Sequence, residues 1–382
     1  MTGSDGRHAL AARMAAAADE WLGRLRPHQR QTALWPAPRS GDARAGDRVR
    51  WFYTPTDHGG LPLGGQAPAQ QALAMRLVAT GLSEAGFNTV ATVMGLENVL
   101  ERVEDWSRDW GFERGRDPAR YWLRVFGRPG RGPWGWRFGG HHVSLNYAVA
   151  GGAVVATTPC FLGADPAVSP LLGGAALRPL GGAEDLARRL VTSLDAAQLA
   201  EAVLHPRAPS DIVGGNRPYL EEGGAMLHMN DSALWRTPVA DARLRQLLDD
   251  IDERAETGAG YAAADHARVA LSAVPRGVPA SRLRAGQRAL LRGLLAAYQR
   301  RVPDEAWRGP YAEADLDFVH FAWAGPVAPG AGHYYRVQGP DVHIEYDNTQ
   351  RDGNHAHSVW RDPGSDFGGD ALREHRARAP HG

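Results

Sequence analysis

The chain of 382 residues contains no lysine and only one cysteine, Cys160. Without lysine the protein cannot form a Schiff base, which excludes pyridoxal-phosphate enzymes and class I aldolases. The phosphate-binding loop GxxxxGK(S/T) is excluded for the same reason. With one cysteine, neither an intrachain disulfide nor a thiolate zinc knuckle can form. We interpret Cys160 as a small buried side chain rather than a nucleophile.

The sequence also lacks net charge and long hydrophobic runs. Its 43 basic and 43 acidic residues balance, so nothing indicates a nucleic-acid-binding surface or a polybasic membrane patch. The first thirty residues have no apolar segment typical of a signal peptide, and the longest apolar runs are too short to span a bilayer. We therefore expect a cytoplasmic protein that binds a small molecule and neither nucleic acid nor membranes. The oligomeric state stays open.

Residues 1–127 are predicted to form a mainly helical layer. Apolar periodicity indicates helices over residues 7–25, 67–85 and 89–110, with Gly86 ending the second and Asn88 capping the third. A fourth helix is expected from Asp117-Pro118 to residue 127, because proline is favoured at the first helical position.

The pattern changes after Gly127. Residues 128–140 read as a loop, and two β-branched runs flanking Gly151-Gly152 predict a β-hairpin. Helices are expected over 183–204, with a break near Ser193, and over 281–301, whereas 205–235 read as irregular. Three further strands, within 315–325, 333–339 and 342–348, are separated by Gly- and Pro-rich turns and predict an antiparallel meander.

Together these patterns predict an α+β fold. The helical N-terminal part should pack on an antiparallel sheet built from the 140s hairpin and the C-terminal meander. The sequence shows no clear linker, so we expect one domain over residues 1–382. Within it, 1–127 would form the helical layer, 128–368 the sheet-containing part with the functional site, and 369–382 a tail.

The strand around residue 345 carries polar side chains at every second position. His343, Glu345 and Asp347 alternate with apolar residues, so all three should point to one face of the sheet. Such a face suits a metal or proton-transfer site better than an apolar core. In an extended segment, His355 and His357 would also share one face.

We therefore predict a site for a divalent transition metal, namely zinc, iron or manganese. The GHH segment would bring additional imidazoles from another strand. The candidate ligands are His141, His142, His343, Glu345, His355 and His357. A metal-free catalytic or binding site, and a purely structural hydrogen-bond network, remain alternative interpretations of the same residues.

The candidate catalytic residues are Glu345, Asp347, His357 and Arg361. Arg361 could bind an anionic substrate group, or could instead form a salt bridge to Asp362 or Asp366 that locks the loop. The predicted function is a metal-dependent hydrolase acting on a small anionic organic substrate. The alternatives are an oxidoreductase with the same ligands, a non-catalytic small-molecule-binding protein, and a metal-free acid–base enzyme.

Four segments of the chain resemble a known family. They are residues 82–87 (LSEAGF), 134–146 (WGWRFGGHHVSLN), 158–167 (TPCFLGADPA) and 343–368 (HIEYDNTQRDGNHAHSVWRDPGSDFG). Together they are similar to the DUF3500 family of bacterial and fungal proteins, over roughly residues 50–378. The resemblance implies no particular chemistry. It implies that the family's signature residues are His141, His142, Glu345, His355, His357, Arg361 and Asp362.

Overall fold

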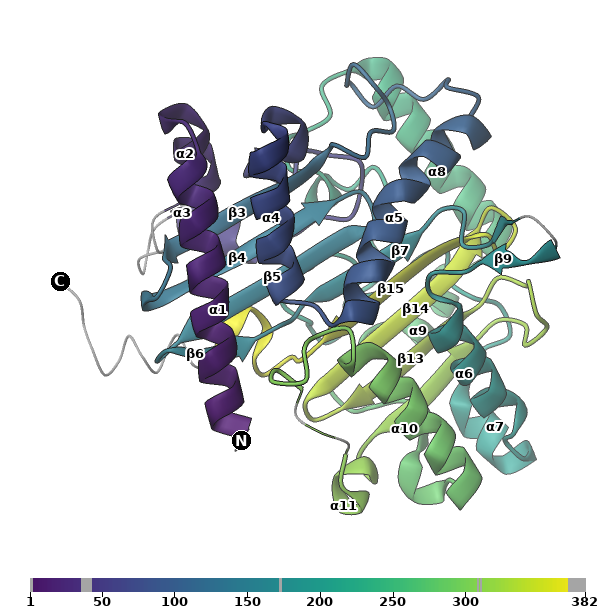
Figure 1. Ribbon diagram of the computed structural model, residues 1–382. Helices are drawn as coiled ribbons and strands as arrows, with labels where there is room; N and C mark the ends of the chain where they lie inside the picture. The colour runs from purple at the N-terminus through teal and green to yellow at the C-terminus, as the bar shows by residue number, and fades with distance from the viewer. Residues whose placement is uncertain (1–2, 36–42, 172–173, 308, 310, 370–382) are drawn as a thin grey trace.

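The computed structural model describes residues 3–35, 43–171, 174–307, 309 and 311–369. Thirteen strands in this part of the chain form one sheet (Figure 1). They are β1 (Leu34–Trp35), β2 (Leu61–Pro62), β3 (Tyr121–Arg128), β4 (Arg131–Gly140), β5 (Val143–Ala150), β6 (Ala153–Ala156), β7 (Cys160–Ala164), β10 (Val203–His205), β11 (Val278–Pro279), β12 (His320–Ala324), β13 (Tyr334–Gly339), β14 (Val342–Gln350) and β15 (His355–Arg361). Two short strands, β8 (Ser169–Pro170) and β9 (Ala176–Leu177), pair separately.

The sheet runs in the order β1-β3-β4-β5-β7-β15-β14-β13-β12-β10, and β2, β6 and β11 pair with β3, β5 and β12. All pairings are antiparallel except β1 with β3 and β10 with β12. Strand β15 joins the two predicted halves, because it pairs with β14 of the C-terminal meander and with β7, which follows the 140s hairpin. The prediction of one sheet from these two segments is confirmed.

Helices cover one face of this sheet. Figure 1 shows α1, α4, α5, α6 and α10 lying across it, with the N-terminus beside the lower end of α1. The helices of the described residues, on both faces of the sheet, are α1 (Gly3–Arg24), α2 (Pro27–Ala33), α3 (Ala43–Val49), α4 (Pro68–Thr80), α5 (Glu84–Val103), α6 (Gly181–Thr192), α7 (Ala196–Ala202), α8 (Ala242–Ala259), α9 (Ala263–Val269), α10 (Ala285–Gln299) and α11 (Glu313–Leu316). The α+β class is therefore confirmed, as is the break near Ser193.

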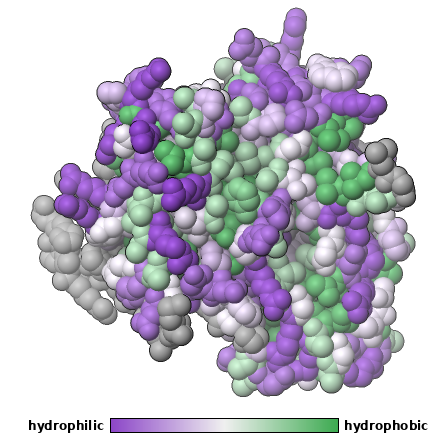
Figure 2. All heavy atoms as spheres, in the orientation of Figure 1, coloured by the Kyte–Doolittle hydropathy of each residue, from purple (hydrophilic) through white to green (hydrophobic). Residues whose placement is uncertain are grey.

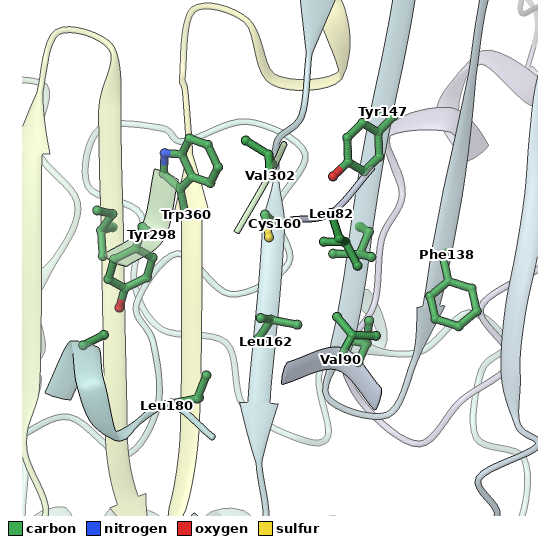
Figure 3. Packing of buried hydrophobic residues seen from close by; sticks show 14 of the residues in the cluster. Leu82, Val90, Phe138, Tyr147, Cys160, Leu162, Leu180, Tyr298, Val302 and Trp360 are labelled. Carbon is green, nitrogen blue, oxygen red and sulfur yellow. The ribbon is translucent and has the colours of Figure 1, made fainter. Parts of the chain in front are cut away.

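The main hydrophobic core lies between these helices and the sheet. Figure 3 shows Cys160 and Leu162 of β7 in this core, near Leu82 and Val90 on one side and Trp360 on the other. On the outer surface, Figure 2 shows hydrophilic side chains along the helices and hydrophobic ones between them. Burial of one apolar stripe per helix is the main force holding this layer on the sheet.

The opposite face of the sheet is largely polar and is covered by other segments of the chain. The irregular segment 205–240, the segment around Trp51 and Tyr53, and helix α8 pack on it. A smaller apolar cluster on this side includes Phe161 of β7, Val359 of β15 and Leu248 of α8. The predicted irregular character of residues 205–235 agrees with the structure, apart from the end of β10 and a short 3-10 turn.

Two predictions around residue 125 are wrong. The expected helix from Asp117-Pro118 is strand β3, and the expected loop over 128–140 is strand β4, which pairs with it. The alternation of apolar side chains explains why this segment is a strand. Trp134, Trp136 and Phe138, at every second position, all pack in the main core. The intervening glycines gave this strand the composition of a loop.

The predicted boundaries of the second and third helices also need correction. Helix α4 ends at Thr80 and α5 begins at Glu84. The capping residue is Ser83, whose hydroxyl accepts a hydrogen bond from the N–H of Gly86 at 3.0 Å, and not Asn88. Gly86 lies in the first turn of α5, where a Cβ atom would come within 2.2 Å of the Arg301 carbonyl oxygen. Close helix packing thus explains this glycine.

Residues 370–382 of the predicted tail lie outside the described residues. Among the helices that the structure does describe, none is long and apolar enough to cross a membrane.

Candidate metal centre

The turn between β4 and β5 consists only of His141 and His142, and it supplies the first imidazole of a buried cluster. His142 has a φ of +64°, in the left-handed region, where histidine is more common than most residues. Its N–H donates to the Tyr53 carbonyl at 3.0 Å, and its carbonyl accepts from the N–H of Gly163 at 2.8 Å. These two bonds fix the turn against the polar face of the sheet.

Strand β15 supplies two further imidazoles. His355 and His357 are two residues apart and point to the polar face, whereas Ala356 between them is fully buried in the main core. Because β15 lies in the middle of the sheet, paired with both β7 and β14, its backbone is held on both sides. The extended conformation that the HxH spacing required is therefore present.

The three imidazoles converge. Nε2 of His142 lies 2.9 Å from Nε2 of His355 and 3.3 Å from Nε2 of His357. One ring nitrogen from each of the three residues lies within 4.8 Å of the others. Nitrogen ligands of a tetrahedral zinc ion, each ~2.0–2.1 Å from it, lie about 3.3 Å apart. The His142–His357 spacing matches this value and the His142–His355 spacing is somewhat shorter, so the three rings could hold one ion.

Burial favours the neutral form of two of these rings, those of His142 and His355. It lowers the pKa of His142 and that of His355 well below the ordinary value, and the neighbouring imidazoles lower both further. A neutral imidazole keeps a lone pair on one nitrogen, which is the form that binds a metal ion.

Outer hydrogen bonds orient the ring of His357. Its Nδ1–H donates to Oδ1 of Asp211 at 2.7 Å, and Oδ2 of Asp211 accepts from the Tyr53 hydroxyl at 3.3 Å. With the proton held on Nδ1, the lone pair of Nε2 faces the other two imidazoles. A carboxylate on the outer nitrogen of a histidine is the usual arrangement around protein-bound metals.

His355 also faces a carboxylate. Its Nδ1 lies 3.6 Å from Oδ2 of Asp165, which is also 3.0 Å from Nε of Arg351. Burial raises the pKa of Asp165 to about 6, although the positive charge of Arg351 opposes this shift. Asp165 thus resembles Asp211 in its position behind a ring of the triad, at a longer distance.

His141 lies outside the triad but contacts it. Its ring stacks on that of His142 with the centroids 3.7 Å apart. Nδ1 of His141 lies 2.5 Å from Oε1 of Glu97, and Arg116 approaches the same nitrogen at 3.3 Å. Burial raises the pKa of Glu97 to about 8, although the positive charge of Arg116 opposes this increase. His141 thus packs against the His142 ring from outside the triad.

The triad lies on the wall of a cavity of about 860 Å³, within the range typical of small-molecule sites. Helices α5 and α8, the segment after α5 and the loop between β14 and β15 contribute to its walls. Its apolar lining includes Val103, Trp110, Met229 and Ile251, and its basic lining consists of Arg108, Arg116, Arg207, Arg254 and Arg351. A ligand in this cavity would contact both the imidazoles and guanidinium groups.

The family model described as protein of unknown function (DUF3500) matches residues 7–369. The chain belongs to the DUF3500 family. The match spans nearly the whole chain and confirms the resemblance seen in the four motifs. No curated protein and no solved structure matches the chain. The function of this DUF3500 protein must therefore be argued from its own residues.

Glu345 and His343 of this DUF3500 protein form a separate buried cluster. The carboxylate of Glu345 accepts hydrogen bonds from the N–H groups of Val213 (2.7 Å) and Gly214 (3.0 Å), the Tyr334 hydroxyl (2.7 Å) and Nε2 of His343 (2.9 Å). Four donors occupy both oxygens. The structure does not bring Glu345 or His343 into the triad, and neither lines the cavity.

Asp347 lies opposite His357 in the β14–β15 pairing but also outside the cavity lining. Its carboxyl group is held by the N–H of Thr349 at 3.1 Å and by the hydroxyl of the same residue. Burial raises the pKa of Asp347 well above the ordinary range, and the negative charge of Asp211 raises it further. It is part of the polar face and has no contact with the three ring nitrogens.

Arg361 is not among the residues that line the cavity and is 1% exposed. Its Nε donates to Asp366 at 2.6 Å, and its two terminal nitrogens donate to the carbonyls of Arg217 (2.8 Å) and Pro218 (2.6 Å). All three guanidinium nitrogens are thus used within the protein. This geometry corresponds to the loop-locking alternative.

Sequence reasoning missed the two carboxylates behind the triad and the tyrosine beside them. Asp211 lies in the irregular segment, where no periodicity indicates which way a side chain points. Tyr53 lies in an apolar run that is also too short to indicate which way its side chains point. Asp165 lies in the TPCFLGADPA motif, so the family resemblance was a signal for the segment, although not for this residue.

Proposed function

We propose that this protein is a metal-dependent hydrolase in which His142, His355 and His357 bind one divalent transition metal ion. The observation that carries the proposal is the convergence of three imidazoles on a cavity wall, with one ring nitrogen of each within 4.8 Å of the others. Zinc is the first choice, and iron and manganese are the alternatives. A bound ion would supply a Lewis acid and lower the pKa of a coordinated water to ~7.

The surrounding residues support catalysis rather than mere storage of an ion. Three protein ligands leave a fourth position open, as in catalytic zinc sites, whereas structural sites have four protein ligands. The open side would face the cavity, because other sides are occupied by the strands and by His141. Asp211 and Asp165 lie behind the ligand rings and would fix their orientation during turnover.

The cavity lining supports an anionic organic substrate. Five arginine side chains and three carboxylates line it, and apolar side chains lie between them. Arg116 and Arg351 lie nearest the triad, through His141 and Asp165 respectively. Guanidinium groups of the lining could hold a carboxylate or phosphate, and those near the reacting centre would stabilise negative charge that develops on an oxygen.

The Asp211–His357 pair also supports a second candidate, a metal-free acid–base enzyme. A carboxylate that holds the Nδ1 proton leaves Nε2 free to accept a proton from a substrate in the cavity. This candidate uses His357 alone as the base, whereas the first requires all three imidazoles.

Elemental analysis of the purified, untagged protein separates the candidates. We expect about one equivalent of transition metal, or its recovery after chelation and addition of zinc, iron or manganese. Metal-dependent hydrolysis of a panel of carboxylate-bearing esters, amides and phosphoesters should follow. His357→Ala should abolish both metal content and hydrolysis, whereas His343→Ala, a buried histidine of the same sheet face, should keep the metal. Absence of metal after every reconstitution would contradict the proposal.

A further inference from the structure

The cavity has a buried floor and an open mouth. At the floor, His142 and His357 are 2% and 5% exposed. At the mouth, Arg207 has a side chain that is 54% exposed, and Arg254 is also exposed. A ligand that fills the cavity would therefore have one end near the triad and the other end near these arginines.

One face of helix α8 forms a wall of the cavity. Residues 251, 254, 255, 258 and 259 line it, which is the spacing of a single helix face. Apart from Arg254, these residues are isoleucine, alanine and glycine, so the wall is apolar and carries only short side chains next to the arginine. Such a wall suits the apolar body of a ligand that lies along the helix.

The five arginines of the cavity differ in their partners. Arg108 and Arg116 pair with Glu104 at 3.4 and 2.8 Å, Arg351 with Asp165 at 3.0 Å, and Arg207 with Asp265 at 3.5 Å. In the part of the chain that the structure describes, no hydrogen bond or ion pair joins the Arg254 guanidinium to another residue. Its donors are therefore available to a ligand.

We infer that the cavity binds an amphipathic carboxylic acid derivative, with its free carboxylate on Arg254 at the mouth and its apolar body along α8. One part of this inference rests on the proposed function, namely that the other end of the molecule carries a hydrolysable group and lies at the triad. Arg254 is thus a specificity-determining residue, because its planar guanidinium can bind a carboxylate through two hydrogen bonds. The apolar contacts select the length and bulk of the body.

Binding of a matched pair of probes to the metal-free protein tests this inference without any turnover. The probes are 6-phenylhexanoate and its neutral amide, 6-phenylhexanamide, measured by isothermal titration calorimetry. We expect the carboxylate to bind about tenfold more tightly than the amide, the effect of roughly one hydrogen bond between charged groups. Arg254→Gln should remove this preference. Arg243→Gln, which removes the same charge from an exposed position of the same helix outside the cavity lining, should keep it.

A second pair of variants tests the position of the apolar body. Ala255→Trp would fill the space beside the α8 wall and should weaken binding of both probes, whereas Ala242→Trp, at the exposed start of the helix, should not. Equal affinity of the two probes for the wild-type protein, or an unchanged preference in Arg254→Gln, would overturn the inference. Unchanged binding in Ala255→Trp would overturn it as well.

These outcomes are independent of the metal. If the protein binds no ion but keeps the Arg254-dependent preference, the proposed hydrolase fails and the anion-binding cavity stands. If the ion is present but the preference is absent, the cavity assignment fails and the metal centre stands.

Discussion

Nδ1 of His357 lies 2.7 Å from Oδ1 of Asp211, although the two residues are 146 positions apart in the chain. One belongs to a central strand and the other to an irregular segment that folds over the polar face of the sheet. A structural role alone would not require the remaining nitrogen of this ring to point at two further imidazoles. The pair therefore connects the packing of the irregular segment with the orientation of the candidate metal ligand.

The first prediction concerns this pair. Asp211→Asn removes the charge behind His357 and should lower metal affinity by about 10- to 100-fold, as is typical for residues behind metal ligands. Competition with a chromophoric chelator measures the affinity. Asp352→Asn is the matched control, because Asp352 lines the same cavity and is exposed without contacting an imidazole of the triad. Equal affinities of the two variants would show that Asp211 does not support the ligand.

The second prediction concerns Arg361. Arg361→Met should lower the free energy of unfolding by about 3 kcal/mol or more, because it leaves the buried carboxylate of Asp366 without its partner. Metal content and affinity for 6-phenylhexanoate should stay unchanged, since Arg361 does not line the cavity. Chemical denaturation and calorimetry measure the two effects.

The double variant Arg361→Met/Asp366→Asn provides the control for this prediction. It removes both charges and should recover part of the lost stability. A drop in probe affinity with unchanged stability would instead restore Arg361 to the ligand site.

The polar face of strands β14 and β15 shows what could and what could not be predicted from the sequence. Period-two alternation correctly placed His343, Glu345 and Asp347 on one face, and the HxH spacing placed His355 and His357 together. Alternation cannot tell which of these residues is covered by a loop and which faces a cavity. The loop carrying Val213 and Gly214 covers Glu345 and donates hydrogen bonds to its oxygens, so this predicted ligand does not lie with the three imidazoles.

The fold shows a similar limit. The C-terminal meander was predictable because turns rich in glycine and proline separate clear strands. Strand β4 was not, because its glycines at 135, 139 and 140 give a loop composition while its aromatic residues pack into the core. Close neighbours require both Gly135 and Gly140. A Cβ atom at Gly135 would lie 2.2 Å from the Tyr147 carbonyl oxygen, and one at Gly140 would lie 2.4 Å from the Tyr121 ring. Only tertiary contacts reveal that reason.

The third prediction concerns pH and Glu345. Burial opposes ionisation of Glu345, but the hydrogen bond and charge of His343 outweigh it and lower the pKa below its ordinary value of 4.5. Because the pKa is lower in the folded state, ionised Glu345 stabilises the fold above pH 4.5, and this contribution is lost as pH falls below 4.5. Glu345→Gln should therefore cost about 3 kcal/mol at pH 7, and less at pH 3.

Denaturation curves of the wild type and of Glu345→Gln at several pH values measure this difference. Glu253→Gln, at an exposed position of α8, is the control and should match the wild type throughout. A stability difference that stays constant from pH 7 to pH 3 would mean that the ionised carboxylate contributes nothing.

The last prediction concerns Gly163 of β7, which lies directly beneath the triad. A Cβ atom at this position would lie 2.7 Å from Cδ2 and 2.8 Å from Cγ of the His142 ring. Gly163→Ala should therefore displace the imidazole, and since ligand nitrogens must lie ~2.0–2.1 Å from zinc, metal affinity should fall at least about tenfold. Gly214→Ala is the matched control, because its Cβ atom would meet Oε1 of Glu345 at 2.5 Å, away from the triad. It should lower the melting temperature but keep the metal. If Gly163→Ala binds metal as tightly as Gly214→Ala, His142 is not a ligand, and the centre must be built from His355 and His357 with another partner.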